Sequence, residues 1–270
     1  MRGSAARRFR DSRPRDPAQT ASILAPAQRG PAPRTPPPDP SGTPVTAAEY
    51  PRPEPPDRRG YTASARYIGR VPISNEHIVW IDCEMTGLNL EADALIEVAV
   101  LVTDSELNVL GDGVDVVISP DPAALAQMGD FVRTMHTTSG LLEELPQGMS
   151  MEEAEAKVLA YIQEWVPEPR KAQLAGNSVG TDRNFLARDM PRVIEHLHYR
   201  IIDVSTIKEL ARRWFTRAYF QAPAKLGGHR ALGDIQDSIR ELRYYRRAVF
   251  VPSPGPDSAA SKAVAQELDA

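Results

Sequence analysis

The chain has 270 residues, a formal net charge of −4 and a single cysteine. This length allows one sizeable domain with extensions, or two small domains. The lone cysteine excludes an intramolecular disulfide and a zinc site built from cysteines. No apolar run approaches the length of a membrane span, so we expect a cytoplasmic protein that does not enter a membrane.

The first 66 residues differ in composition from the rest. They contain 14 of the 25 prolines and 12 arginines against 6 acidic residues, whereas residues 67–270 carry a net charge of −10. Such a segment has too few large apolar side chains to fold, so we predict a disordered extension over residues 1–70. A dispensable extension, an upstream start codon, a nucleic-acid-binding tail and a transit peptide remain open, although the prolines disfavour the last.

Residues 71–251 are expected to form one α/β domain. Apolar runs predict strands over 78–84, 94–103 and 109–118, and short turns between them indicate antiparallel hairpins. Ser150 and Glu153 form a capping box that opens a helix with apolar positions up to Trp165. Short strands over 173–176 and 201–203 then alternate with helices over 181–197, up to Trp214, and over 232–249. Pro191 is expected to break the first of these helices, and residues 252–270 to form a flexible tail.

The most informative pair is Asp82 and Glu84, at the end of the first apolar run. Side chains alternate along a strand, so both acids project from one face, whereas Cys83 faces the opposite side. Buried carboxylates repel each other and lose hydration, which a divalent cation with oxygen ligands compensates. The pair therefore points to metal-dependent chemistry.

Two further acids and a histidine stand near predicted helix starts. Asp182 follows the strand at 173–176, and Asp234 lies five residues after His229. Taken singly, each acid fits an ordinary helix cap or a partner of the helix dipole. Glu97, an acid within an apolar strand, fits either a partner of the site or an edge position.

Four stretches carry a resemblance to a known family. They are WIDCEMTGL (80–88), GNSVGTD (176–182), HRALGDI (229–235) and YRIIDVSTIKELARRW (199–214). The first three are similar to the motifs of the DEDDh exonuclease superfamily, and the fourth resembles the oligoribonuclease family within it. The resemblance covers roughly residues 78–249 and implies a ribonuclease-H-like fold, with a mixed five-stranded sheet flanked by helices.

The resemblance also implies an activity, a cofactor and a set of residues. The activity is 3′-to-5′ hydrolysis of short oligoribonucleotides, down to dinucleotides, to nucleoside 5′-monophosphates. Two divalent ions, Mg or Mn, are implied, with His229 as general base. The implied metal ligands are Asp82, Glu84, Asp182 and Asp234. The implied substrate contacts are Leu88, Phe131, His136, Ser178, Tyr199, Arg200 and Ser205.

Assembly and substrate length follow from the same resemblance. Tyr199 and Arg200 are expected to reach the site of a partner protomer, which implies a homodimer. The acidic domain is compatible with a short substrate, because proteins that hold long nucleic acids usually carry a basic face. Two alternatives remain: a DEDDh exonuclease for longer RNA or DNA, and a catalytically silent nucleic-acid-binding domain.

Overall fold

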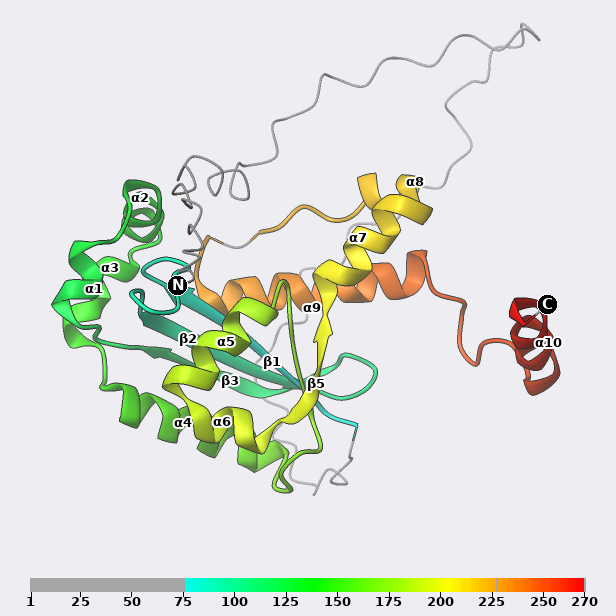
Figure 1. Cartoon of the computed structure of the whole chain (residues 1–270), viewed down its shortest axis with the longest axis horizontal. Helices are drawn as coiled ribbons and strands as arrows, with labels where there is room; N and C mark the ends of the chain where they lie inside the picture. The colour runs from blue at the N-terminus through cyan, green and yellow to red at the C-terminus, as the bar shows by residue number, and fades with distance from the viewer. Residues whose placement is uncertain (1–75, 227, 270) are drawn as a thin grey trace, which may run out of the picture. The chain divides into compact units, whose positions relative to one another are not determined.

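The computed structural model describes residues 76–226 and 228–269, and one mixed sheet organises them (Figure 1). Its strand order is β3-β2-β1-β4-β5, in which β1, β2 and β3 are antiparallel and β4 and β5 run parallel to β1. The predicted five-stranded α/β fold is confirmed. The strands are β1 (Ile78–Met85), β2 (Leu95–Thr103), β3 (Val109–Val117), β4 (Gln173–Gly176) and β5 (His198–Asp203).

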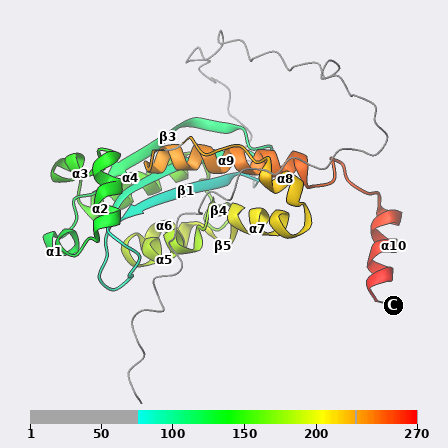
Figure 2. The same cartoon turned by 90° about the horizontal axis from the view of Figure 1, so that it is seen from above.

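Helices cover both faces of this sheet, and β1 sends alternate side chains to each. Val79, Ile81 and Cys83 join the apolar cluster formed with α4 (Met151–Trp165), α5 (Gly180–Asp189) and α6 (Pro191–His196). Trp80 joins the second cluster, in which α9 (Ala231–Ala248) packs along the sheet (Figure 2). The alternation expected of β1 is therefore observed, and its two acids lie on the face that α9 covers.

The longer helices begin and end close to where the sequence predicts. The capping box of Ser150 and Glu153 opens α4, and Met190 separates α5 from α6 at the expected proline break. Helix α7 (Val204–Trp214) ends at the predicted residue. The short helices that the sequence did not predict are α1 (Pro122–Ala126), α2 (Asp130–Thr138), α3 (Leu141–Glu144), η2 (Leu145–Gln147) and α8 (Thr216–Phe220).

Two predictions concern the ends of the chain. The predicted disordered extension over residues 1–70 lies outside the described residues. The segment predicted to be a flexible tail contains a helix, α10 (Ser258–Leu268), capped by Asp257; its flexibility stays a prediction. Within residues 76–226 and 228–269, no helix has the length and apolar character needed to cross a membrane.

Candidate active site

Three carboxylates meet where β1 lies against the first turn of α9. Asp82 and Glu84 project from the strand, and Asp234 lies in the first turn of the helix. Oxygen atoms of the three side chains lie within 4.8 Å of one another. One cation with oxygen ligands can bind all three groups at this spacing. The structure thus brings together three of the four predicted metal ligands.

Asp182, the fourth predicted ligand, comes from the first turn of α5 and is 7% exposed. Its Oδ1 accepts a hydrogen bond from the backbone N–H of Cys83 at 3.0 Å, between the two acids of β1. The negative charge of Asp182 also raises the pKa of both Asp82 and Glu84. Asp182 therefore belongs to the same electrostatic cluster.

Burial raises the pKa of all four carboxyl groups. The pKa of Asp82 is raised well above its usual range by burial and then by the neighbouring acids. Burial, with repulsion from Asp234, raises the pKa of Glu84 to about 8, and burial raises that of Asp182 to about 6. The pKa of Asp234 is raised by burial too. Crowded carboxylates of this kind are the donor set that hard divalent cations prefer, so the residues present fit a metal site.

His136, predicted to orient a base, lies behind Glu84 and has no exposed surface. Its Nε2 donates to the carbonyl of Met85 at 2.9 Å, which leaves Nδ1 without a hydrogen-bond partner, 3.9 Å from Glu84 Oε2. Burial lowers the pKa of this imidazole. In this position the ring supports the end of β1, and its contact with a base stays a prediction.

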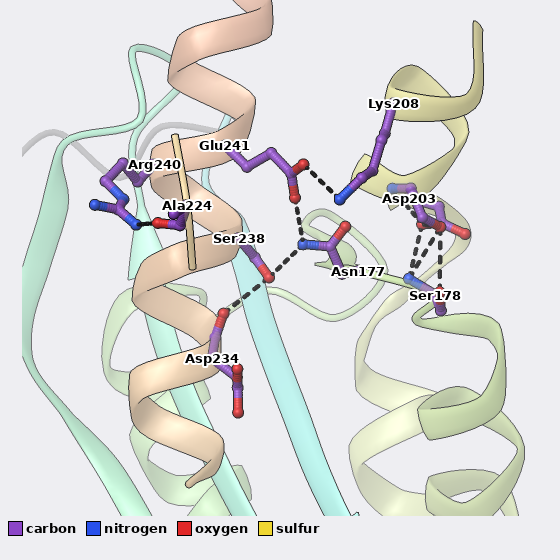
Figure 3. Close-up of polar contacts among 10 residues, drawn as sticks. Asn177, Ser178, Asp203, Lys208, Ala224, Asp234, Ser238, Arg240 and Glu241 are labelled. Atoms are coloured by element: carbon purple, nitrogen blue, oxygen red, sulfur yellow. Dashed lines mark hydrogen bonds and ion pairs between the residues drawn. The ribbon is translucent and has the colours of Figure 1, made fainter. Parts of the chain in front are cut away.

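His229 and Lys225 lie on the segment that leads into α9. Both side chains are exposed, and the positive charge of Lys225 lowers the pKa of Asp82 and Asp234, against the larger effect of burial. The segment is tied to α9, because the Leu226 N–H donates to Asp237 at 2.6 Å. Arg240 of α9 also binds the Ala224 carbonyl (Figure 3). A cation and an imidazole are thus presented beside the acids.

Leu88 stands on the loop directly after β1 and is 56% exposed. The carboxylate of Asp93 organises this loop by accepting from the Thr86 hydroxyl at 3.1 Å and from the Asn89 N–H at 2.8 Å. A Cβ at Gly87 would collide with an oxygen of the same carboxylate, so a side chain there would force Asp93 to shift. The loop therefore presents an apolar side chain four residues after Glu84.

Ser178 and Ser205 lie side by side, with their hydroxyl oxygens 3.4 Å apart. Asp203 accepts hydrogen bonds from the backbone N–H of Ser178 at 3.0 Å and from that of Ser205 at 2.9 Å (Figure 3). Ser178 has a left-handed backbone with φ of 54°, a strained conformation that these bonds maintain. Two hydroxyls are thus held together at the starts of α5 and α7.

A polar network joins this region to the acid-bearing helix. Asn177 donates to Ser238 at 2.9 Å and to Glu241 at 3.1 Å, and Ser238 donates to the backbone carbonyl of Asp234 at 2.9 Å (Figure 3). Lys208 of α7 pairs with Glu241 at 3.0 Å. The network therefore connects two parts of the chain, the segment before α5 and helix α7, to α9, which carries Asp234.

The other predicted substrate contacts are at the surface. Phe131 of α2 is 66% exposed, and Tyr199 is 70% exposed on β5, the last strand of the sheet. The Tyr199 hydroxyl accepts from Arg200 Nε at 3.0 Å, with the guanidinium 5.5 Å from the ring centroid. No contact in the described part of the chain joins Tyr199 or Arg200 to the four acids, so within one protomer these two residues lie apart from the cluster.

Sequence reasoning missed three residues of the site: Lys225, Asn177 and Asp203. Asn177 and Asp203 lie inside two of the motif stretches, 176–182 and 199–214, and this was the available signal. Lys225 stands four residues before His229 with no distinguishing pattern. Its place near the acids depends on contacts between the loop and α9, which no local pattern reveals.

Comparison with known proteins identifies the family to which the chain is similar. The family model described as exonuclease (RNase_T) matches residues 79–242. An oligoribonuclease of Streptomyces griseus is 67% identical over 196 residues, covering 73% of this chain and 98% of that protein. An oligoribonuclease of Leifsonia xyli subsp. xyli is 59% identical over 195 residues, covering 72% and 94%.

A solved structure shares the fold. A product-bound exonuclease I matches with a TM-score of 0.50 and 15% identity, over 65% of this chain. The matched region spans 44% of that exonuclease I chain. At this identity the likeness concerns the fold alone.

Proposed function

The chain belongs to the exonuclease family and, within it, to the oligoribonucleases, and on this premise we propose that it removes nucleotides from the 3′ end of very short RNAs. The final substrates in this proposal are dinucleotides, and the products are nucleoside 5′-monophosphates. The observation that carries the proposal is the meeting of Asp82, Glu84 and Asp234 within 4.8 Å.

The four acids are proposed to hold two divalent ions, Mg or Mn. When bound, such ions activate a water for attack on phosphorus and stabilise the charge that develops on the leaving oxygen. The task of the protein is to keep four carboxylates close in spite of their repulsion. The hydrogen bond between Asp182 and the Cys83 N–H and the attachment of Asp234 to α9 support this assignment.

His229 is proposed as the general base. Its exposed imidazole stands on the segment before α9, close enough for its charge to lower the pKa of Asp234. An imidazole can accept the proton of the attacking water near neutral pH. Lys225, on the same segment, supplies a positive charge for the substrate phosphate.

Substrate length is proposed to be limited by residues around this centre. Leu88 separates the two bases, and Phe131 offers an exposed ring for stacking, which is typically worth about 1–3 kcal/mol per base. The paired hydroxyls of Ser178 and Ser205 bind the 5′ phosphate. A 5′ phosphate bound to these hydroxyls leaves no space for a further nucleotide, so a longer strand does not fit.

A homodimer completes the proposal. The outer edge of β5 has no further strand in the described part of the chain, and apolar side chains are exposed on β5, α7 and α8 and in the connection between these two helices. They are Tyr199, Ile201, Trp214, Phe215 and Phe220. Covering this surface with a second copy would bring Tyr199 and Arg200 towards the partner's 5′-phosphate site. A cytoplasmic location is part of the same proposal.

The product pattern on a labelled trinucleotide tests this function. A 5′-labelled triribonucleotide with Mg or Mn should give labelled dinucleotide first and labelled mononucleotide second. Asp82→Ala should fold normally by circular dichroism and release nothing. Labelled mononucleotide as the first product would reverse the polarity, and undiminished activity of Asp82→Ala would contradict the assigned acids.

A further inference from the structure

Glu97 is a charged residue in the middle of β2, a strand buried along its whole length, and its own exposure is 0%. It stands opposite Glu84 in the pairing of β1 with β2. Its Oε1 accepts from Arg230 Nε at 2.6 Å, and its Oε2 accepts from the Ala231 N–H at 2.9 Å. A buried carboxylate is costly unless it is fully paired, so these two bonds are what permit Glu97 in the core.

Arg230 reaches a second carboxylate as well. Its two terminal nitrogens bind Glu144 of α3 at 2.7 and 3.1 Å. We call the three side chains of Glu97, Arg230 and Glu144 the clamp. The Glu144 side chain is 48% exposed and that of Glu97 is 0% exposed. Ion pairs that are open to water contribute little to stability. The buried ion pair between Arg230 and Glu97 therefore contributes most of the stability of the clamp.

The clamp holds the two residues that follow His229. Arg230 is the N-cap residue of α9 but makes no capping hydrogen bond with its own side chain, and Glu97 instead binds the helix start from across the sheet. His229 itself has a left-handed backbone, with φ of 57°. A non-glycine residue keeps that conformation only where its surroundings impose it.

We propose that Glu97 is a positioning residue for His229: through Arg230 and Ala231 it fixes the backbone from which the imidazole reaches the reacting water. The inference rests on the proposed role of His229 as general base. Glu97 itself touches neither substrate nor water. The charge of Glu97 also raises the pKa of Glu84, and Asp234 lies in the first turn of α9, whose start Glu97 binds. The His229→Ala background in the test below therefore separates an effect on the imidazole from an effect on the acids.

The chain contains a matched ion pair that serves as a control. Glu155 of α4 accepts from the Arg192 N–H at 2.7 Å and from Arg192 Nε at 2.6 Å, at the start of α6. Glu155 is 7% exposed. It binds a helix start in the same way as Glu97, but α6 carries none of the candidate site residues. Glu155→Gln therefore reports the cost to stability alone.

The test is a double-mutant cycle of Glu97→Gln with His229→Ala, assayed by steady-state kinetics with a diribonucleotide. Glutamine keeps the volume and an acceptor for the Ala231 N–H but loses the charge. We expect kcat to fall roughly 10- to 100-fold with KM changed less than about twofold, because misplacing a reacting group by about 1 Å costs on that order. Glu155→Gln should lower Tm similarly and leave kcat unchanged.

The second arm of the cycle decides how Glu97 acts. In the His229→Ala background, Glu97→Gln should cause no further loss, because residues that act as one unit are not additive. Equal losses in both backgrounds would overturn the positioning role, as would an unchanged kcat in Glu97→Gln. If His229→Ala alone retained full activity, the base assignment itself would fail. Should Glu97→Gln not fold, Arg230→Lys, which keeps the charge but loses the planar fork, takes its place with the same expectations.

Discussion

The carboxylate of Asp182 accepts a hydrogen bond of 3.0 Å from the backbone N–H of Cys83, the residue between Asp82 and Glu84. The start of α5 is thereby fastened to β1 at the one position where the strand carries an acid on either side. The pairing of β1 with β4 ends at Trp80, so β4 does not take up the Cys83 N–H. The acid cluster is thus assembled by the protein fold itself.

The stability of the metal-free protein should fall as the pH rises. The pKa of Glu84 is raised from its ordinary value of 4.5 to about 8 in the folded state. A carboxyl group of this kind contributes its full stability below pH 4.5 and loses it as the pH rises through about 8, because the folded state binds the proton more tightly. After EDTA treatment, Tm should therefore be lower at pH 8.5 than at pH 5.5.

Divalent metal should offset that loss. We expect Mn or Mg to raise Tm by roughly 5 °C at pH 8.5, and by less at pH 5.5, where protons compete for the same oxygens. Glu84→Gln is the control, since it removes one of the four titrating groups and should make the metal-free profile less steep. A metal-free Tm that is constant or rises over this range would contradict the account of the cluster.

Lys225→Ala should weaken substrate binding. A charge-assisted contact with phosphate is worth about 1.5–3 kcal/mol, so we expect KM for a dinucleotide to rise about tenfold or more, with less effect in Lys225→Arg. Lys171→Ala is the matched control, because Lys171 pairs with Glu168 at 3.6 Å away from the acids. Equal behaviour of the two alanine variants in steady-state kinetics would remove Lys225 from the site.

Ser205→Ala should weaken recognition of the 5′ phosphate. Loss of one hydrogen bond to a charged phosphate should lower kcat/KM for a 5′-phosphorylated dinucleotide about tenfold. The substrate supplies the control, since a dinucleotide with a 5′ hydroxyl has no phosphate to lose and should be cut equally by both proteins. A uniform loss on both substrates would show that the hydroxyl only supports the fold around Asp203.

Mixing two inactive variants tests whether Arg200 acts across a dimer. A hybrid of His229→Ala and Arg200→Ala protomers contains one site with both defects and one with neither, if Arg200 serves the partner. Random exchange should then restore about a quarter of wild-type activity, since an interface with twofold symmetry pairs the subunits equally. Light scattering should report a dimer throughout. No recovery after verified subunit exchange would place Arg200 in its own protomer's site or in none.

Much of the fold follows from local patterns. The period of two along β1 predicted the shared face of Asp82 and Glu84, and the capping box at Ser150 predicted the start of α4. The start of β5 was missed, because residues 198–200 include polar, exposed side chains at the last strand of the sheet and show no alternation. The helices α1 and α3 were missed because they are only five and four residues long, so periodicity has little length over which to act. Helix α2 has nine residues, but it starts after Gly129 without a side-chain cap, so no start signal marks it.

The supports of the site depend on tertiary contacts and were not predictable in the same way. From the sequence, Glu97 fitted an edge position as well as a partner of the site. Its contact with Arg230, 133 positions away in the sequence, forms only in the folded chain. The place of His136 behind Glu84 likewise results from α2 packing against the end of β1. Motifs therefore indicate which groups do the chemistry, whereas long-range packing decides how they are held.

A length series tests the central claim most directly. Wild-type protein with Mg or Mn should be given 5′-labelled oligoribonucleotides of two to twenty residues and the matching DNA series, with Asp82→Ala as the inactive reference. The account predicts that kcat/KM is highest for the diribonucleotide and falls as nucleotides are added. A preference that rises with length in either series would contradict it, and so would a protein that binds these strands but cuts none of them.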